Sequence, residues 1–152
     1  MSENLFSPAF FVFLGFALPI SFIDIRSYRI PDVLCIPCFL LILILHIWGN
    51  PGLLPNFLAA AGISGLVFFL IRLATKGLGL GDVKFAALTG LFCGLPWAWA
   101  AFLIAALTGL GAALLFTARK TTDHPPRIPF APFLSLGAIA AYGLSRYISH
   151  FF

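Results

Sequence analysis

The stretch Trp97–Thr117, WAWAAFLIAALTGLGAALLFT, contains no charged side chain. At about 1.5 Å per residue, a helix of this length crosses the roughly 30 Å hydrocarbon core of a bilayer. The whole chain of 152 residues is 61% hydrophobic and 9% charged, whereas soluble domains are about 25% charged. We therefore expect an all-α, polytopic membrane protein that forms a single transmembrane domain over residues 1–152.

Four further apolar runs have about the length of a spanning helix, and one more run is short. The longer runs are Leu5–Ile23, Val33–Trp48, Phe57–Ala74 and Phe130–Ile148. The short run, Phe85–Leu95, covers only roughly 17 Å as a helix. We expect it to be a short span, a re-entrant segment, or part of a helix that includes residues of the Gly-rich stretch before it. Glycines inside the long runs (Gly62, Gly65, Gly109 and Gly111) are expected to allow close helix packing.

The basic residues favour six spanning helices over five. With six helices, the connections 24–32, 72–84 and 118–129 lie on one side of the membrane. They hold eight of the nine basic residues: Arg26, Arg29, Arg72, Lys76, Lys84, Arg119, Lys120 and Arg127. The positive-inside rule places these connections in the cytoplasm and both termini outside. Because the basic residues form no continuous polar patch, we expect no nucleic-acid partner.

Asp24 and Asp82 are two of only five acidic residues, and each lies at the edge of an apolar run. A negative charge at the end of the first helix opposes the helix dipole, so the placement of Asp24 indicates a use. Asp82 follows the alternating glycines of Gly77–Gly81, and irregular backbone at membrane depth must face protein or a water-filled cavity. A flexible loop with Asp82 as a helix N-cap is equally compatible with this spacing. Asp32, directly before the second run, is expected to cap that helix.

Two carboxylates at one membrane face can perform acid–base chemistry. One pKa rises, the pair shares a proton, and the pair can activate a water against a peptide bond. This chemistry needs neither a metal nor a cofactor. Cys35-Ile-Pro-Cys38 has no second CxxC pair, so we expect both cysteines to be packing residues rather than zinc ligands. The histidines His46, His124 and His150 are scattered.

The chain resembles the type IV prepilin peptidases, a family of GxGD aspartic membrane proteases. The resemblance rests on four segments: Asp24 followed by Ile30-Pro31-Asp32, the Gly79–Lys84 motif GLGDVK, Phe85–Gly90, and Ile128–Leu134 (IPFAPFL). It implies that Asp24 and Asp82 are catalytic and that Gly79 and Gly81 form the motif backbone. Lys84, Arg29, Ile30 and Pro31 are then expected to bind substrate or support the site.

The resemblance also implies a function. Members remove a short basic leader from prepilin or pseudopilin precursors at the cytoplasmic face of the inner membrane, for type IV pili and secretion. The substrate helix stays in the bilayer, and the basic leader stays near anionic lipid. Longer members carry an N-terminal segment with two CxxC pairs linked to N-methylation. No such segment precedes Leu5 here, so we expect peptidase activity without methyltransferase activity, as in minimal members serving Tad-type pili or archaeal-flagellin-like systems.

Two alternatives remain open at this point. A non-catalytic channel, transporter or pilus-assembly scaffold could use Asp24 and Asp82 as proton or ion ligands. A peptidase of related GxGD type could act on other peptides.

Overall fold

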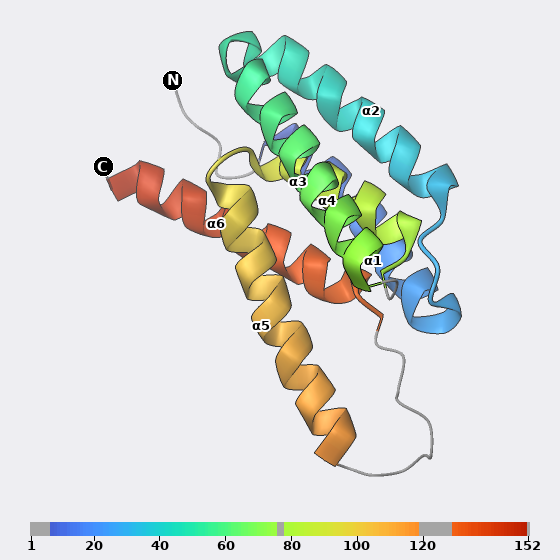
Figure 1. The fold of residues 1–152 in the computed structure, drawn as a ribbon. Helices are drawn as coiled ribbons and strands as arrows, with labels where there is room; N and C mark the ends of the chain where they lie inside the picture. The colour runs from blue at the N-terminus through green and yellow to red at the C-terminus, as the bar shows by residue number, and fades with distance from the viewer. Residues whose placement is uncertain (1–6, 76–77, 119–128, 152) are drawn as a thin grey trace.

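A computed structural model describes residues 7–75, 78–118 and 129–151. These residues form six α-helices and one 3-10 helix, with no strand among them (Figure 1). The elements are α1 (Pro8–Ser27), α2 (Asp32–Gly49), η1 (Pro51–Leu53), α3 (Leu54–Thr75), α4 (Leu80–Cys93), α5 (Trp97–Ala118) and α6 (Ala131–Phe151). The expectation of an all-α helical bundle is confirmed, and each expected run corresponds to one helix.

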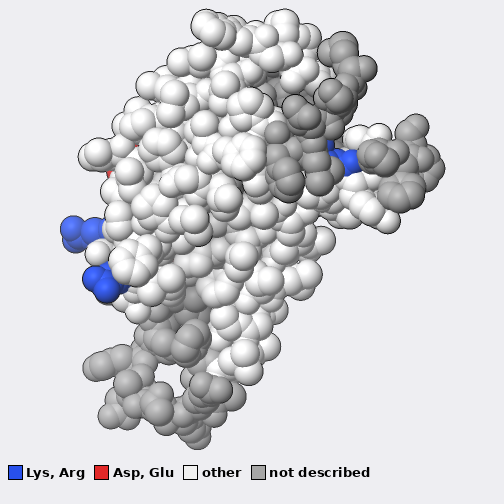
Figure 2. Space-filling model, turned by 180° about the vertical axis from the view of Figure 1, so that it is seen from behind, with Lys and Arg blue, Asp and Glu red and all other residues white. Residues whose placement is uncertain are grey.

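Four segments in the described part of the chain are long and apolar enough to cross a membrane. They are Pro8–Ser27, Asp32–Gly49, Pro51–Thr75 and Trp97–Leu115. The surface agrees with this composition, because the described part of one face shows almost no charged side chain, and the basic ones that are visible lie at its edges (Figure 2). An uncharged surface of this extent fits contact with lipid.

The short fourth helix, α4, is the centre of the bundle. It begins at Leu80, so it includes residues of the Gly-rich stretch, as the last of the three alternatives expected. Its 14 residues give a length of roughly 21 Å, too short for the hydrocarbon core. Every residue from Leu88 to Cys93 is buried, and α4 contacts all five other α-helices. Because protein encloses the second half of α4, the helix does not need the length of a lipid-facing span.

Two glycines allow the closest helix approaches, and they are not the ones that the sequence indicated. A Cβ on Gly90 of α4 would lie 2.5 Å from the Ala60 carbonyl oxygen of α3, and one on Gly137 of α6 would collide with the Ala101 carbonyl of α5. Of the expected glycines, Gly65 packs against Ala87 of α4. A Cβ at Gly62 or Gly111 would meet no atom within 4 Å, so, contrary to the expectation, neither glycine packs closely against another helix of this bundle.

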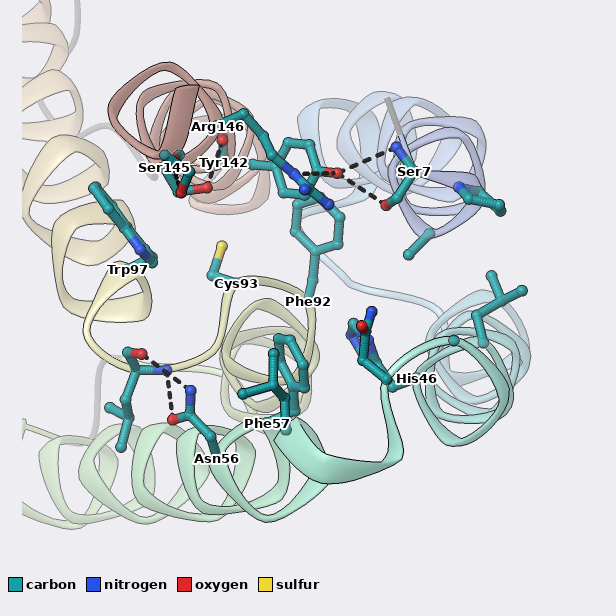
Figure 3. A pocket seen from close by; sticks show the side chains of 18 of the residues that line it. Ser7, His46, Asn56, Phe57, Phe92, Cys93, Trp97, Tyr142, Ser145 and Arg146 are labelled. Carbon is teal, nitrogen blue, oxygen red and sulfur yellow. Dashed lines mark hydrogen bonds between the residues drawn. The ribbon is translucent and has the colours of Figure 1, made fainter. Parts of the chain in front are cut away.

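At one end of the bundle, neutral polar side chains hold the helix connections together (Figure 3). The Asn56 side chain donates to the Leu95 carbonyl and accepts from the Leu95 N–H, both at 3.2 Å. Nε2 of His46 lies 3.1 Å from the Leu91 carbonyl oxygen, and the ring stacks on Phe57. The hydroxyl of Tyr142 bonds Ser7 at the start of α1. We call this end, defined by Ser7, His46, Asn56, Leu95 and Tyr142, the polar end.

A cavity of about 590 Å³ opens at the polar end. Its lining includes His46, Asn56, Phe92 and Arg146, and neither Asp24 nor Asp82 belongs to it. His46 is buried and hydrogen-bonded, so it is a packed residue of the bundle. Cys35, Cys38 and Cys93 are free thiols buried in the core, which agrees with the packing role expected for the first two.

Candidate active site

Asp24 lies within α1, one turn before its end, rather than in the connection that follows. The helix continues to Ser27 and ends at Tyr28, whose φ of 50° is left-handed and whose N–H bonds the Asp24 carbonyl oxygen. The Asp24 side chain is buried, with 4% of its surface exposed. Its Oδ2 accepts a hydrogen bond of 2.9 Å from the N–H of Ala131, the first residue of α6. The carboxylate that opposes the α1 dipole is therefore stabilised by the N-terminus of α6.

Asp82 lies in the first turn of α4, outside the four helices that are long enough to span. The N-cap residue is Gly79, whose N–H donates to Asp82 Oδ2 at 2.9 Å. Asp82 is therefore not the N-cap residue. It is the third residue of the helix, and its side chain accepts a hydrogen bond from the N–H of the N-cap residue, as in a capping box. This bond fixes the carboxylate at the beginning of the helix.

The pKa of Asp82 is raised from its ordinary value. Burial is the largest cause, since a low-dielectric surrounding disfavours the charged form. The hydrogen bond from Gly79 acts in the opposite direction, and the negative charge of Asp24 raises the pKa further. The two carboxylates are thus close enough to interact electrostatically.

The contact between Ile30 and Gly81 joins the two motifs that carry the aspartates. A Cβ on Gly81 would lie 2.8 Å from the Ile30 Cβ and 3.3 Å from the Ile30 carbonyl oxygen. Only glycine allows this approach, which brings the connection after α1 against the first turn of α4. Pro31 is the N-cap residue of α2, with extended backbone, and Arg29 is exposed on the same connection. We call the end defined by Asp24, Ile30, Gly81, Asp82 and Ala131 the carboxylate end.

Asp32 forms an ion pair instead of the expected cap. It is the first residue of α2, where no side chain makes a capping hydrogen bond, so the capping prediction was wrong. Its Oδ2 accepts from Nζ of Lys84 at 2.6 Å. Both side chains are about half exposed, and such pairs contribute little net stability. The Lys84 side chain, on α4, therefore pairs with a residue of α2 and not with either of the two candidate catalytic carboxylates.

The beginning of α6 is the part of this site that sequence reasoning missed. The segment around Ala131 was noted only for its resemblance to a family motif, and no rule of spacing linked it to Asp24, 107 residues away. The local signal is Pro132 next to the first helical residue, a position that favours a helix start and hence free backbone N–H groups. Several residues of the sequence analysis lie outside the described residues: Lys76, Gly77, Arg119, Lys120, His124, Arg127 and Ile128.

Among the residues that the structure describes, no group of three or more His, Cys, Asp or Glu side chains could hold a metal ion. The arrangement of Asp24 and Asp82 is suited to proton transfer, because one carboxylate is buried and the other is partly buried with a raised pKa.

A model of the Type IV leader peptidase family matches residues 11–114. This chain belongs to the type IV leader peptidase family. The matched segment includes both aspartates, the Ile30–Asp32 connection and the whole of α4.

Curated relatives carry matching names. The prepilin leader peptidase/N-methyltransferase of Escherichia coli is 32% identical over 152 residues, covering 93% of this chain and 65% of the relative. The protein of the same name from Xanthomonas campestris is 36% identical, covering 80% of this chain and 44% of the relative. Leader peptidase HopD of Salmonella typhimurium is 31% identical, covering 85% and 88%. The chain thus spans less than two thirds of the first two relatives. No solved structure matches it.

Proposed function

We propose that this chain is a membrane-embedded aspartic endopeptidase that removes the short basic leader from type IV prepilin or pseudopilin precursors. Asp24 and Asp82 are its catalytic residues. The observation that carries the proposal is that the two carboxylates lie on the last turn of α1 and the first turn of α4, which the close contact between Ile30 and Gly81 joins at one end of the bundle. Membership of the family and the names of the relatives support peptidase activity.

The two carboxylates act as a pair that shares one proton. The ionised carboxylate takes a proton from a water molecule as the water oxygen attacks the scissile carbonyl carbon. The protonated carboxyl donates a hydrogen bond to the carbonyl oxygen, and a proton then passes to the leaving amine. The bond from Ala131 holds Asp24, and the bond from Gly79 holds Asp82. Fixed carboxylates of this kind need no metal and no cofactor.

The carboxylate end faces the cytoplasm of the inner membrane, and both termini lie outside. The described basic side chains support this orientation, because Arg26, Arg29, Arg72 and Lys84 lie on elements at the carboxylate end. Arg146 lies at the polar end, against Tyr142. In this orientation the precursor's hydrophobic helix stays in the bilayer, while its basic leader lies next to anionic lipid headgroups at the site.

A channel or transporter that uses the same acids is the less well supported alternative. Transport sites lie near the bilayer midplane on broken helices. Asp24 and Asp82 instead lie at helix ends, on the same end of the bundle. A related peptidase for other peptides would show the same dyad, and a panel of precursor and unrelated membrane peptides would distinguish it.

The test is co-expression of the chain with a prepilin, scored by removal of the leader. Asp24→Asn and Asp82→Asn keep the shape of each side chain and an oxygen that can accept the helix-end hydrogen bond, but remove the ionisable group. We expect each variant to lose cleavage by about 10³-fold or more while inserting normally. Cleavage at the parent rate by either variant would refute the dyad.

Asp32→Asn is the matched control. Asp32 lies at the same end, but it is half exposed and pairs with Lys84, so its carboxamide variant is expected to lose far less activity than Asp24→Asn or Asp82→Asn. Chelators should leave the parent rate unchanged, and a loss of activity on chelation would contradict the metal-free mechanism. The absence of methyltransferase activity stays a prediction, and mass spectrometry of the new N-terminus tests it.

A further inference from the structure

An open groove runs between α2 and α3 above α4. Both helices pack on α4, but they make few contacts with each other (Figure 1). The groove has a volume of about 560 Å³ and is lined by Phe39 of α2, by α3 from Leu58 to Phe69, and by Val83 and Ala87 of α4. A smaller hollow of about 250 Å³ shares Phe39 and Ala87 with it and reaches Lys84. The two hollows adjoin at Phe39 and Ala87 and form one open, mostly apolar depression on the surface of the bundle.

The shape of the groove suits a helix. Its floor is made of small residues, Ala61, Gly62 and Gly65 on α3 and Ala87 on α4, and such residues let another helix backbone approach closely. A side chain at Gly62 would meet no atom within 4 Å, so nothing in the bundle fills the groove there. From Leu58 to Phe69 the groove follows α3 for roughly 16 Å, about half of the hydrocarbon core.

We infer that this groove binds the hydrophobic helix of the precursor and holds it beside α4. This inference rests on the proposed peptidase function and adds the place where the substrate's membrane segment docks. Val83, which lines the groove, directly follows Asp82 in the first turn of α4. A helix lying in the groove therefore leads toward Asp82, where the peptide bond next to that helix must arrive to be cut.

A foreign helix fits the groove better than a second copy of this chain. In a two-fold symmetric dimer the same surface must be complementary to itself, and two concave grooves facing each other leave a void. The rim residues Leu66 and Phe69 are 57% and 41% exposed, so they are free to contact a helix that enters from the bilayer.

The inference is tested by a substitution that places a large side chain in the groove. Gly62→Leu adds a side chain at a position where a Cβ meets no atom within 4 Å, so we expect it to fill the groove and leave the packing of the bundle unchanged. Gly111→Leu is the matched control, since Gly111 is also a helical glycine with no atom within 4 Å, but on α5. Each purified variant, reconstituted in lipid, is assayed with a whole precursor and with a peptide that keeps the leader and the scissile bond but ends a few residues after it, so that it lacks the hydrophobic helix.

We expect Gly62→Leu to lower kcat/KM for the whole precursor by about tenfold or more and to leave the truncated peptide unaffected. Gly111→Leu should change neither value. Parent-like cleavage of the precursor by Gly62→Leu, or an equal loss with both substrates, would overturn the inference. If the parent cleaves neither substrate, it is the proposed function that fails.

Photocrosslinking tests the groove independently of cleavage. A photoreactive amino acid at Leu66, 57% exposed on the rim, is compared with one at Leu107, 61% exposed on α5. We expect the precursor's hydrophobic segment to crosslink to position 66 and not to position 107. Crosslinks from position 66 only to lipid or only to a second copy of the chain would overturn the inference.

Discussion

The two ends of this bundle use polar groups in opposite ways. At the polar end, neutral side chains bond helix ends and turns, as Asn56 does with both backbone groups of Leu95. At the carboxylate end, ionisable side chains accept from backbone N–H groups at helix starts: Asp24 from Ala131, the first residue of α6, and Asp82 from Gly79, the N-cap residue of α4. A neutral amide satisfies a turn without the free-energy cost of burying a charge. An amide could accept the same backbone hydrogen bonds as Asp24 and Asp82. The presence of carboxylates at these positions therefore indicates a chemical role and not a structural one.

The close approach at Gly81 is the point at which the carboxylate end is most sensitive. Gly81→Ala places a Cβ 2.8 Å from the Ile30 Cβ, so the connection after α1 must move away from the first turn of α4. A shift of about 1 Å between catalytic groups costs about a hundredfold in rate, and we expect a loss of that size in leader cleavage. Thermal unfolding should change far less.

A second substitution sharpens this prediction. Ile30→Ala keeps the Cβ that the new side chain would strike, so it should not restore activity to Gly81→Ala. Ile30→Gly removes that Cβ and should restore activity in part, because the Ile30 carbonyl oxygen still lies 3.3 Å away. Equal rescue by both substitutions would show that this contact is not the cause.

The polar end should respond in the opposite sense. Asn56→Ala leaves the N–H and carbonyl of Leu95 without their partner, and such a loss costs about 1–3 kcal/mol. We expect a lower denaturation temperature in detergent but an unchanged cleavage rate per folded molecule. Asn50→Ala, at the same end with an exposed side chain, is the control and should change neither. A reduced rate per folded molecule for Asn56→Ala would break the separation of the two ends.

The fold was largely predictable from the sequence, because apolar length and charge asymmetry are properties of the chain itself. Apolar length predicts the all-α class and one helix for each run, and charge asymmetry predicts that both aspartates lie at the same end of the bundle. The contacts of the site were less predictable. The bond between Ala131 and Asp24 and the pairing of Asp32 with Lys84 both depend on helices that meet only in the folded bundle. The roles of Asp24 and Asp82 in catalysis stay predictions.

The predictions about the glycines were only partly right, for a related physical reason. Helices in a bilayer are apolar on both their lipid-facing and protein-facing sides, so periodicity does not reveal which face is packed. Gly62 and Gly65 are close in sequence, yet only Gly65 touches another helix while Gly62 faces the open groove.

The smallest expected effect is on the pH dependence of the protein's stability. It distinguishes a carboxylate whose charge destabilises the fold from one whose charge does not. The folded-state pKa of Asp82 is raised, mainly by burial and further by the charge of Asp24. Its contribution to stability is therefore complete below the unfolded pKa of about 3.9 and is lost as the pH rises through the higher folded value.

Asp82→Asn does not ionise, so its denaturation temperature should rise relative to that of the parent between about pH 4 and pH 7. Asp32→Asn removes an acid that is paired with Lys84 at the surface and should show no such gain. If Asp82→Asn and the parent differ by the same amount at about pH 4 and at about pH 7, burial does not penalise the Asp82 charge, and the two ends of the bundle do not differ in the electrostatic cost of their polar groups.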